Sequence, residues 1–478
     1  MKLTCCFRRA FLPLLILIWV AAFFGYLGWK PGFAYNAQRY FEILILGCIL
    51  CVGVTLTIRF RWGRIWGGGC VVLLLLMVLA VWQADNRWLA FREGALYLAL
   101  FAGVLAVAKV RAHAGAASFD RAAYTGLVLF SFGCSLIVLE GLLLSLSINK
   151  LDPRIIFGAF VNVRVLAELQ FLTLLLLPAA WLQADSIGWR RFVALTAVLW
   201  WALLLLTGTR AALIALPFSL LVLFLTAGRD ALQWFRVLGA QFIGGLCVFL
   251  VMRVGVAHFL GQPLLGEGGM SFARASSSGR LELWWNAWVH FLERPWLGNG
   301  PGSFACFSNQ LVATPHNLFF QFLSEWGLLV TLLAFALALF IFIKLVQHLR
   351  FRPECSVLHY SLFATLITVV TASMMEGMIT GPLQQMLIVL VFGWALQIFG
   401  GERFFLQVAS GSLGYRSIRL LLLVAFLALT LWGVKADLAM QRELLVSPDG
   451  KVNLSYGPRF WADGHDYCPG WHERYEKR

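Results

Sequence analysis

Long runs of apolar residues, separated by short polar loops, make up most of this chain. Runs of about 17 to 25 apolar residues are long enough to cross a bilayer as a helix. We therefore predict an all-α, polytopic integral membrane protein with about 12–13 transmembrane helices. The candidate spans are 11–28, 41–58, 68–82, 91–108, 122–148, 165–182, 191–206, 210–227, 235–256, 316–343, 357–375, 382–400 and 417–434.

One long polar loop interrupts this alternation of apolar runs and short loops late in the sequence.

The N-terminus is basic and precedes the first apolar run. It is typical of a retained signal anchor, because no clear cleavage pattern follows it. We divide the chain into N-terminal membrane helices (1–256), a catalytic loop (257–315), C-terminal membrane helices (316–434) and a polar tail (435–478).

The lysines and arginines of the short loops set the expected orientation, because such residues concentrate on the cytoplasmic side. With the N-terminus inside, the inside loops hold about 19 of these residues and the opposite short loops about 8. This orientation places the 257–315 loop and the tail outside, which is the periplasm in a Gram-negative cell.

Composition supports lipid as the solvent: 60% of the residues are hydrophobic and 13% are charged, where a soluble domain has about a quarter charged. The net charge of +15 does not call for a nucleic-acid partner, since basic loops are what membrane topology requires. It also suits an anionic lipid-linked substrate. The ten cysteines lack the spacing of zinc ligands, and we predict no metal and no cofactor.

The polar loop contains a predicted short helix that begins near Arg280, with Ser278 as its N-cap. Its apolar residues recur at helical spacing, and Pro295 ends it. The three tryptophans among them suit a helix lying in the membrane interface. An arginine opposes the helix dipole at this position, so we interpret Arg280 as part of a phosphate site. A solvated or snorkelling arginine is the alternative. The apolar stripe consists of Leu281, Trp284, Trp285, Trp288 and Leu292.

A glycine- and proline-rich run, Pro295–Gly302, follows this helix. It follows no strand, so it does not fit a dinucleotide-binding fingerprint. We predict a tight turn whose backbone approaches another part of the molecule closely.

The next membrane helix opens at Thr314, with Pro315 in its first turn. His316 then lies at the outer surface, where the helix N-terminus favours a neutral imidazole that can serve as a general base. A histidine that only caps the helix is the alternative. Polar residues must face protein or water inside a membrane, and such a stripe follows His316: Asn317, Gln321 and Ser324, with Glu325 beside it.

Two further arginines, Arg210 and Arg164, open membrane helices on the same outer side. Snorkelling at a helix mouth explains one such arginine, but several on one face favour an anion site. The chain has no nucleophile elbow, zinc-protease motif or Walker loop. Its outer aspartates are isolated, so a metal-bound nucleotide sugar is disfavoured as the donor.

The segments SSGRLELWWNAWVHFLERPWLGNGPGSF and PHNLFFQFLSEWG resemble the signature region of the O-antigen ligase superfamily. This superfamily includes O-antigen polymerases and pilin-type protein O-oligosaccharyltransferases. The resemblance covers roughly residues 200–335 by motif and most of the chain by its pattern of spans.

The resemblance implies a metal-independent, inverting transferase in the bacterial inner membrane, fed by an undecaprenyl-diphosphate-linked glycan. It implies that His316 activates the acceptor hydroxyl and that Arg210 and Arg280 bind the diphosphate. Arg164, Asn317, Gln321 and Glu325 are possible supporting residues.

Lipid A-core is the acceptor in the leading interpretation. A pilin or other secreted protein, or a growing glycan chain, is the alternative. A non-enzymatic flippase of lipid-linked glycans is the alternative from another class, but its charges belong in the middle of the bilayer rather than at helix mouths on one side.

Cys306 and Cys468 are both predicted to lie outside, where disulfides can form. A bridge between them would attach the tail to the loop. No spacing argument requires this pair.

Overall fold

The computed structural model describes residues 31–56, 58–60, 63–149, 153–160, 163–260, 279–307, 312–352, 355–401 and 405–407, with Val424 and Cys468. The first and last predicted spans, 11–28 and 417–434, lie outside the described residues apart from Val424. So do the N-terminal anchor, residues 261–278 of the loop, and the tail apart from Cys468.

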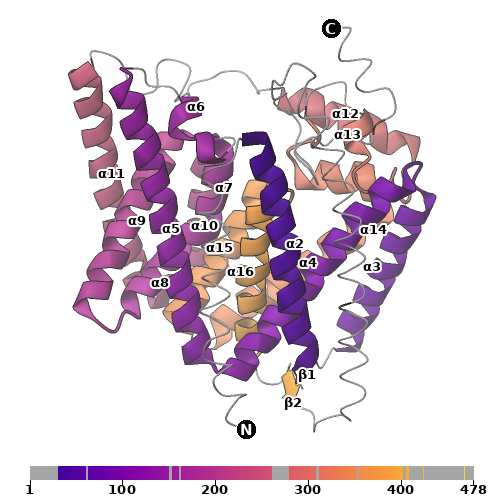
Figure 1. The fold of residues 1–478 in the computed structure, drawn as a ribbon. Helices are drawn as coiled ribbons and strands as arrows, with labels where there is room; N and C mark the ends of the chain where they lie inside the picture. The colour runs from indigo at the N-terminus through magenta and orange to yellow at the C-terminus, as the bar shows by residue number, and fades with distance from the viewer. Residues whose placement is uncertain are drawn as a thin grey trace. The chain divides into compact units, whose positions relative to one another are not determined.

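The described residues are almost entirely helical (Figure 1). The longer helices are α2 (Pro31–Thr55), α3 (Arg64–Gln83), α4 (Arg87–Ala114), α5 (Ala116–Ser147), α7 (Val163–Thr173), α9 (Ile187–Thr207), α10 (Arg210–Ala227), α11 (Leu232–Leu260), α12 (Arg280–Glu293), α14 (Leu318–Phe351), α15 (Val357–Ser373) and α16 (Pro382–Gly400). The short helices are α6 (Pro153–Ile156), η1 (Gly158–Phe160), η2 (Leu174–Leu176), α8 (Leu177–Leu182), η3 (Gly228–Ala231) and α13 (Phe304–Phe307).

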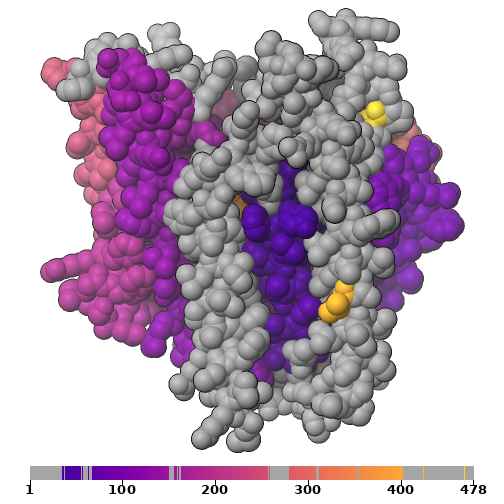
Figure 2. Space-filling view, viewed as in Figure 1, coloured from indigo at the N-terminus to yellow at the C-terminus, as the bar shows by residue number. Residues whose placement is uncertain are grey.

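Every predicted span within the described residues coincides with a helix or a run of joined helices. Seven helical stretches in this part of the chain have the length and composition to cross a membrane, and two apolar stretches are shorter, Gly67–Gln83 of α3 and Val357–Ser373, which is α15. Large apolar side chains remain exposed on α5, α9 and α11, which lie on the face shown in Figure 2. Such surfaces belong in lipid, and the predicted all-α polytopic membrane fold is confirmed.

The chain forms two units. The first contains Met1–Leu27, Ala114–Ala275 and Val346–Ala372, and the second contains Gly28–His113, Ser276–Leu345 and Ser373–Arg478.

In the first unit, buried polar side chains find partners on neighbouring helices, as a membrane interior requires. Trp234 Nε1 of α11 donates to Ser361 Oγ of α15 at 2.7 Å. Trp200 Nε1 of α9 donates to Thr173 Oγ1 of α7 at 2.8 Å. These bonds fix which faces of the apolar helices meet, because leaving one partner unpaired in an apolar interior is costly.

In the second unit, Trp326 and Val330 of α14 pack with Ala80 of α3 to form a buried cluster. Helix α2 begins at Pro31, ten residues before the predicted span, so Arg39 belongs to a helix and not to a loop. Arg39 is fully buried. It pairs with Glu42 of the same helix and bonds Gln385 of α16, and this neutralisation lets the helix continue through a charged turn.

Two short strands, β1 (Ile58–Phe60) and β2 (Phe405–Gln407), pair antiparallel in the second unit. Arg59 lies opposite Leu406 in their register. Strand β1 follows the second predicted span and strand β2 follows the twelfth. Both segments are predicted to lie on the cytoplasmic side.

Candidate active site

Helix α12 places Arg280 at its first residue, as predicted. The N-cap is Gly279, with a φ of +75°, and not Ser278 as expected. A glycine takes this left-handed conformation without the penalty that a side chain would add. The side chains of α12 that face protein are Leu283, Ala287, His290 and Phe291.

Arg280 forms an ion pair with Glu376, which the sequence analysis did not single out. Arg280 Nη2 lies 2.6 Å from Glu376 Oε1, and the two side chains are 17% and 3% exposed. Within the described part of the chain, Glu376 Oε2 and Arg280 Nε are buried and have no hydrogen-bond partner. The pair therefore leaves one acceptor and one donor unsatisfied by the described part of the protein.

Glu376 belongs to the connection between α15 and α16, Met374–Gly381, which we call the acidic loop. Helix α2 bonds this loop at one point: Tyr35 Oη and Arg39 Nη2 both donate to Thr380 O, at 3.0 and 2.7 Å. Asn317 Nδ2 bonds it at another, donating to Met374 O at 2.8 Å. The acidic loop is therefore fixed by several elements of the second unit.

His316 lies against the same loop. A Cβ built on Gly377 would lie 3.4 Å from His316 Nδ1 and 3.7 Å from Thr314 Oγ1. Gly377 is the residue after Glu376, so the imidazole and the Arg280 ion pair meet adjacent residues of one short loop.

The start of α14 differs from the prediction. The helix begins at Leu318, and Asn317 is its N-cap, since Asn317 Oδ1 accepts from Phe320 N at 3.1 Å. Thr314 is therefore not the cap. His316 precedes the helix with a φ of +51°, a conformation that costs a non-glycine residue about 1–3 kcal/mol.

The predicted polar stripe is buried, as a spanning helix requires. Asn317 is 9% exposed, Gln321 is 2% exposed, and Ser324 and Glu325 are fully buried. Gln321 Nε2 approaches Tyr97 Oη of α4 at 3.5 Å. These residues stabilise the helix below His316 in an interior position.

The Pro295–Gly302 turn docks on a break in α14. Gly327 interrupts that helix with φ +75° and ψ 179°, which frees carbonyls of the preceding turn. Asn299 N donates to Ser324 O at 3.1 Å, and Gly300 N donates to Glu325 O at 2.9 Å. The predicted close approach of this backbone is confirmed, and the partner is the α14 break.

His290 is buried between α12 and α13. Its Nδ1 lies 3.1 Å from Glu293 Oε2, its Nε2 lies 3.1 Å from Ser303 Oγ, and its ring stacks on Phe307 at 4.3 Å. Burial lowers the pKa of His290 below its usual value, and the bond to Glu293 opposes this shift. A neutral ring that donates to the carboxylate and accepts from the hydroxyl satisfies both nitrogens.

Cys306 and Cys468, whose pairing the sequence left open, form a disulfide with a Cα–Cα distance of 5.0 Å. Cys468 is buried against Ala305 and Ala313. The tail is thus covalently attached beside the segment that leads to His316.

Arg210 and Arg164 lie in the first unit. Arg210 is the first residue of α10, after Thr209, and Arg164 lies in the first turn of α7. Both are half-buried. The structure groups Arg280, His316 and Glu376 within the second unit, and the convergence of Arg210 and Arg164 with them stays a prediction.

Residues 195–335 match the family described as O-antigen ligase. This region is similar to the O-antigen ligase family, which supports the expected superfamily. It contains Arg210, Arg280, His316 and the polar stripe, whereas Arg164 and Glu376 lie outside it. The match supports a glycosyltransferase of the O-antigen ligase and polymerase family. The chain matches no curated protein.

Glu376 lies outside the matched region, so the family match does not point to this residue. The signal in the sequence is an isolated acid in the short run Glu376–Pro382, which contains two glycines and a proline between two apolar spans. Short loops that join spanning helices on the predicted outer side are candidate positions for site residues, as the long loop is, because binding residues concentrate on loops.

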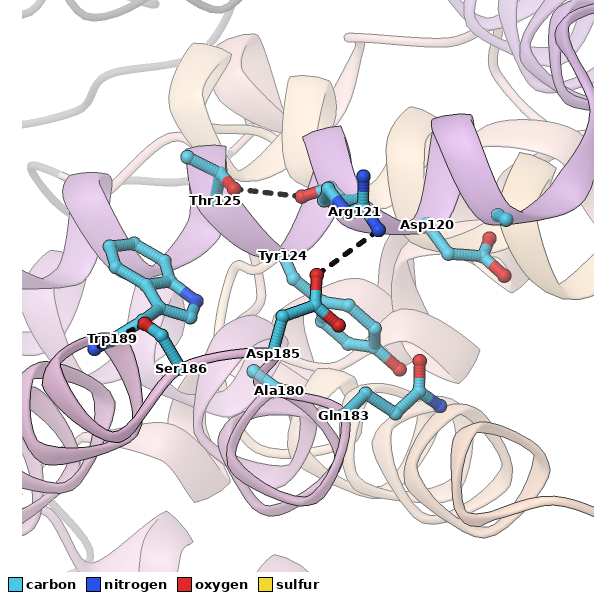
Figure 3. Close-up of a pocket in the computed structure, with 10 residues that line it drawn as sticks. Asp120, Arg121, Tyr124, Thr125, Ala180, Gln183, Asp185, Ser186 and Trp189 are labelled. Carbon is cyan, nitrogen blue, oxygen red and sulfur yellow. Dashed lines mark hydrogen bonds and ion pairs between the residues drawn. The ribbon is translucent and has the colours of Figure 1, made fainter.

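A pocket of about 440 Å³ lies in the first unit, between the start of α5 and the α8–α9 turn (Figure 3). Arg121 Nη2 reaches Asp185 Oδ2 across it at 3.1 Å, but both side chains are about three-quarters exposed. Trp189 and Gln183 also line the pocket. It contains none of the predicted site residues, and the predicted topology places it on the inner side, so it has no part in the candidate site.

Proposed function

We propose that this protein moves a preassembled glycan en bloc from undecaprenyl diphosphate to an acceptor hydroxyl, with lipid A-core as the acceptor. The site faces the periplasm from the bacterial inner membrane. One observation carries the proposal: Arg280 pairs with Glu376, and His316 Nδ1 lies 3.4 Å from the position that a Cβ on Gly377, the next residue, would take. An anion-binding group and a candidate base therefore lie beside one short loop.

Arg280 binds the diphosphate in this proposal. A guanidinium offers five donors in a planar fork that matches phosphate oxygens. Glu376 fixes one edge of that fork and leaves the remaining donors for the ligand. Arg210 contributes a second positive charge from the first unit.

His316 acts as the general base. The acceptor oxygen attacks the anomeric carbon, the bond from that carbon to the diphosphate oxygen breaks, and the acceptor proton passes to the imidazole. A single displacement of this kind inverts the anomeric centre. The arginines stabilise the charge that grows on the departing diphosphate.

No metal is needed in this scheme, because a lipid diphosphate is already a good leaving group and arginines supply the positive charge. Asn317, Gln321 and Glu325 support the base by fixing the helix that follows it. Arg164 is a further candidate for the donor site.

The test supplies polyprenyl-diphosphate glycan to the purified protein with each candidate acceptor: lipid A-core, pilin and a growing glycan. Transfer to lipid A-core that continues in EDTA supports the proposal. Transfer to pilin or to the glycan alone keeps the chemistry and replaces the acceptor. A requirement for Mg²⁺ or Mn²⁺, or no transfer to any acceptor, contradicts the reaction.

A further inference from the structure

Helix α12 has three distinct faces. At about 100° per residue, the protein-facing side chains occupy one sector, and the polar side chains Glu282, Asn286 and Glu293 occupy a second. The third sector is apolar and exposed. It consists of Leu281 at 64%, Trp285 at 64%, Trp288 at 38% and Leu292 at 56% exposure.

Two side chains of α12 contact spanning helices at or near the ends of those helices. Trp284 stacks on Phe320, in the first turn of α14, with 5.7 Å between ring centroids. Arg280 bonds Glu376, six residues before α16 begins. Figure 1 shows α12 beside the ends of α3 and α14. A helix held at the ends of spanning helices lies at the level of the membrane boundary.

The C-terminal end of α12 is bonded to the α3–α4 turn. Arg294 Nη2 lies 2.6 Å from Asp85 Oδ1, and Arg294 Nη1 donates to Gln83 O at 2.8 Å. Gln83 Nε2 in turn donates to Gly298 O at 2.8 Å. These bonds hold α12 level with the outer ends of α3 and α4.

That turn carries two exposed tryptophans, Trp82 at 69% and Trp88 at 49% exposure. Tryptophans at the ends of spanning helices form the aromatic belt of membrane proteins at headgroup level. Trp296, 64% exposed, lies in the turn that follows α12, two residues after Arg294. The exposed apolar face of α12 therefore belongs to an element that is bonded to the tryptophan-bearing ends of α3 and α4.

We infer that α12 is an interfacial helix whose exposed face, Leu281, Trp285, Trp288 and Leu292, is embedded in the outer leaflet of the bilayer. The polar sector faces water and the remaining sector faces protein. The occupant of this face is lipid, because its helix is bonded to a tryptophan belt and the face carries no charge. The helix thereby holds Arg280 at the depth of lipid phosphates.

The test measures the depth of each face in phosphatidylethanolamine–phosphatidylglycerol vesicles. The full-length protein is stripped of free cysteines, keeps the Cys306–Cys468 bridge, and carries one spin label at residue 281, 285, 288 or 292. Matched controls carry the label at 282, 286 or 293. Collision rates with oxygen, which partitions into lipid, are compared with those of a water-soluble nickel complex.

The inference predicts an oxygen-to-nickel collision ratio several-fold higher at the four apolar positions than at the three controls. Equal ratios at all seven positions would place α12 in water and overturn it. Protection of the four positions from both reagents would mean that protein covers the face, and would overturn the inference as well.

A second measurement needs no substitution. It uses the wild-type protein with a phospholipid that carries a photoreactive diazirine near its glycerol. Crosslinks within residues 281–296 support the inference, and their absence there beside crosslinks elsewhere contradicts it.

Discussion

At the residue scale, the Arg280–Glu376 ion pair shapes how the site can work. Both side chains are largely withdrawn from water, so removing one leaves a buried charge that costs about 3–5 kcal/mol. Any test of Arg280 must therefore separate its effect on folding from its effect on the donor.

Arg280→Ala is expected to weaken donor binding by about 10- to 100-fold, the equivalent of a lost charged hydrogen bond, and to slow transfer as well. Arg280→Lys restores part of the loss, because lysine keeps the charge but not the fork. The double variant Arg280→Ala with Glu376→Gln removes the orphaned carboxylate, so it recovers stability but not donor binding. The measurements are donor affinity and thermal unfolding midpoint, with the exposed Arg121→Ala as control. Unchanged donor binding in Arg280→Ala would exclude this residue from the site.

The lowered pKa of His290 predicts that the folded protein loses stability in acid. Its folded pKa lies below the unfolded value of about 6.5, so the unfolded chain binds more protons as the pH falls. Its contribution is present above about pH 6.5 and is lost as the pH falls below that value. Unfolding midpoints measured at pH 7.5 and pH 5.5 should differ more in the wild type than in His290→Gln. An equal difference would assign the acid sensitivity to other groups.

At the element scale, the docking of the Pro295–Gly302 turn on the α14 break connects the loop to the membrane helices. Two main-chain bonds run from the turn to Ser324 and Glu325, and two return from Leu328 and Leu329 to Pro295 and Trp296. At the break, main-chain hydrogen bonds to the turn therefore replace the hydrogen bonds that a continuous helix would form. His316 lies at the head of the same helix, so the docking also fixes the position of the candidate base.

Gly298→Ala tests this docking. Gly298 has a φ of +73°, and an added Cβ would collide with the Glu325 carbonyl. We expect a loss of about 1–3 kcal/mol from the backbone conformation alone, and more from the collision. The matched control is Gly68→Ala in α3, where an added Cβ meets nothing within 4 Å. Equal unfolding midpoints for the two variants would show that the docking does not contribute to stability.

Sequence patterns predicted these elements unevenly. Apolar runs located the membrane helices because burial in lipid demands continuous apolar length. They missed the early start of α2, because Arg39 is buried there by its ion pair with Glu42 and by a hydrogen bond to Gln385, which is far away in the sequence. They missed the α14 break for the same reason. The groups that bond the freed carbonyls of Ser324 and Glu325 are the backbone N–H groups of Asn299 and Gly300, which lie 25 residues earlier in the sequence.

At the scale of the whole molecule, long-range contacts agree with the predicted sidedness. Strands β1 and β2 join two segments predicted to be inside. The Cys306–Cys468 bridge and the Arg294–Asp85 pair each join segments predicted to be outside. A miscounted span between any of these partners would have put them on opposite sides of the membrane.

Reporter fusions check this topology directly. A reporter near Asn299 is expected to be periplasmic and one near Arg350 cytoplasmic, because α14 crosses the membrane between them. Both reporters on one side would contradict the predicted arrangement of the loop.

Sequence patterns singled out Arg280 and His316 as candidates, but they did not single out the acidic loop beside which the structure places both residues. Arg280 and His316 stand out because each occupies an unusual place at the start of a helix. Glu376 does not, because its importance follows from a contact 96 residues away in the sequence. The grouping of Arg210 with this site depends on how the two units meet.

The central claim is that His316 is the base for transfer from a lipid-linked donor. The most direct measurement compares single-turnover transfer and donor binding in the wild type and in His316→Ala, using purified protein, polyprenyl-diphosphate glycan and acceptor. The account predicts a transfer rate lower by about 10²–10⁴-fold, with donor binding nearly unchanged, because a base acts at the transition state. A His316→Ala variant that transfers glycan at the wild-type rate would contradict the account.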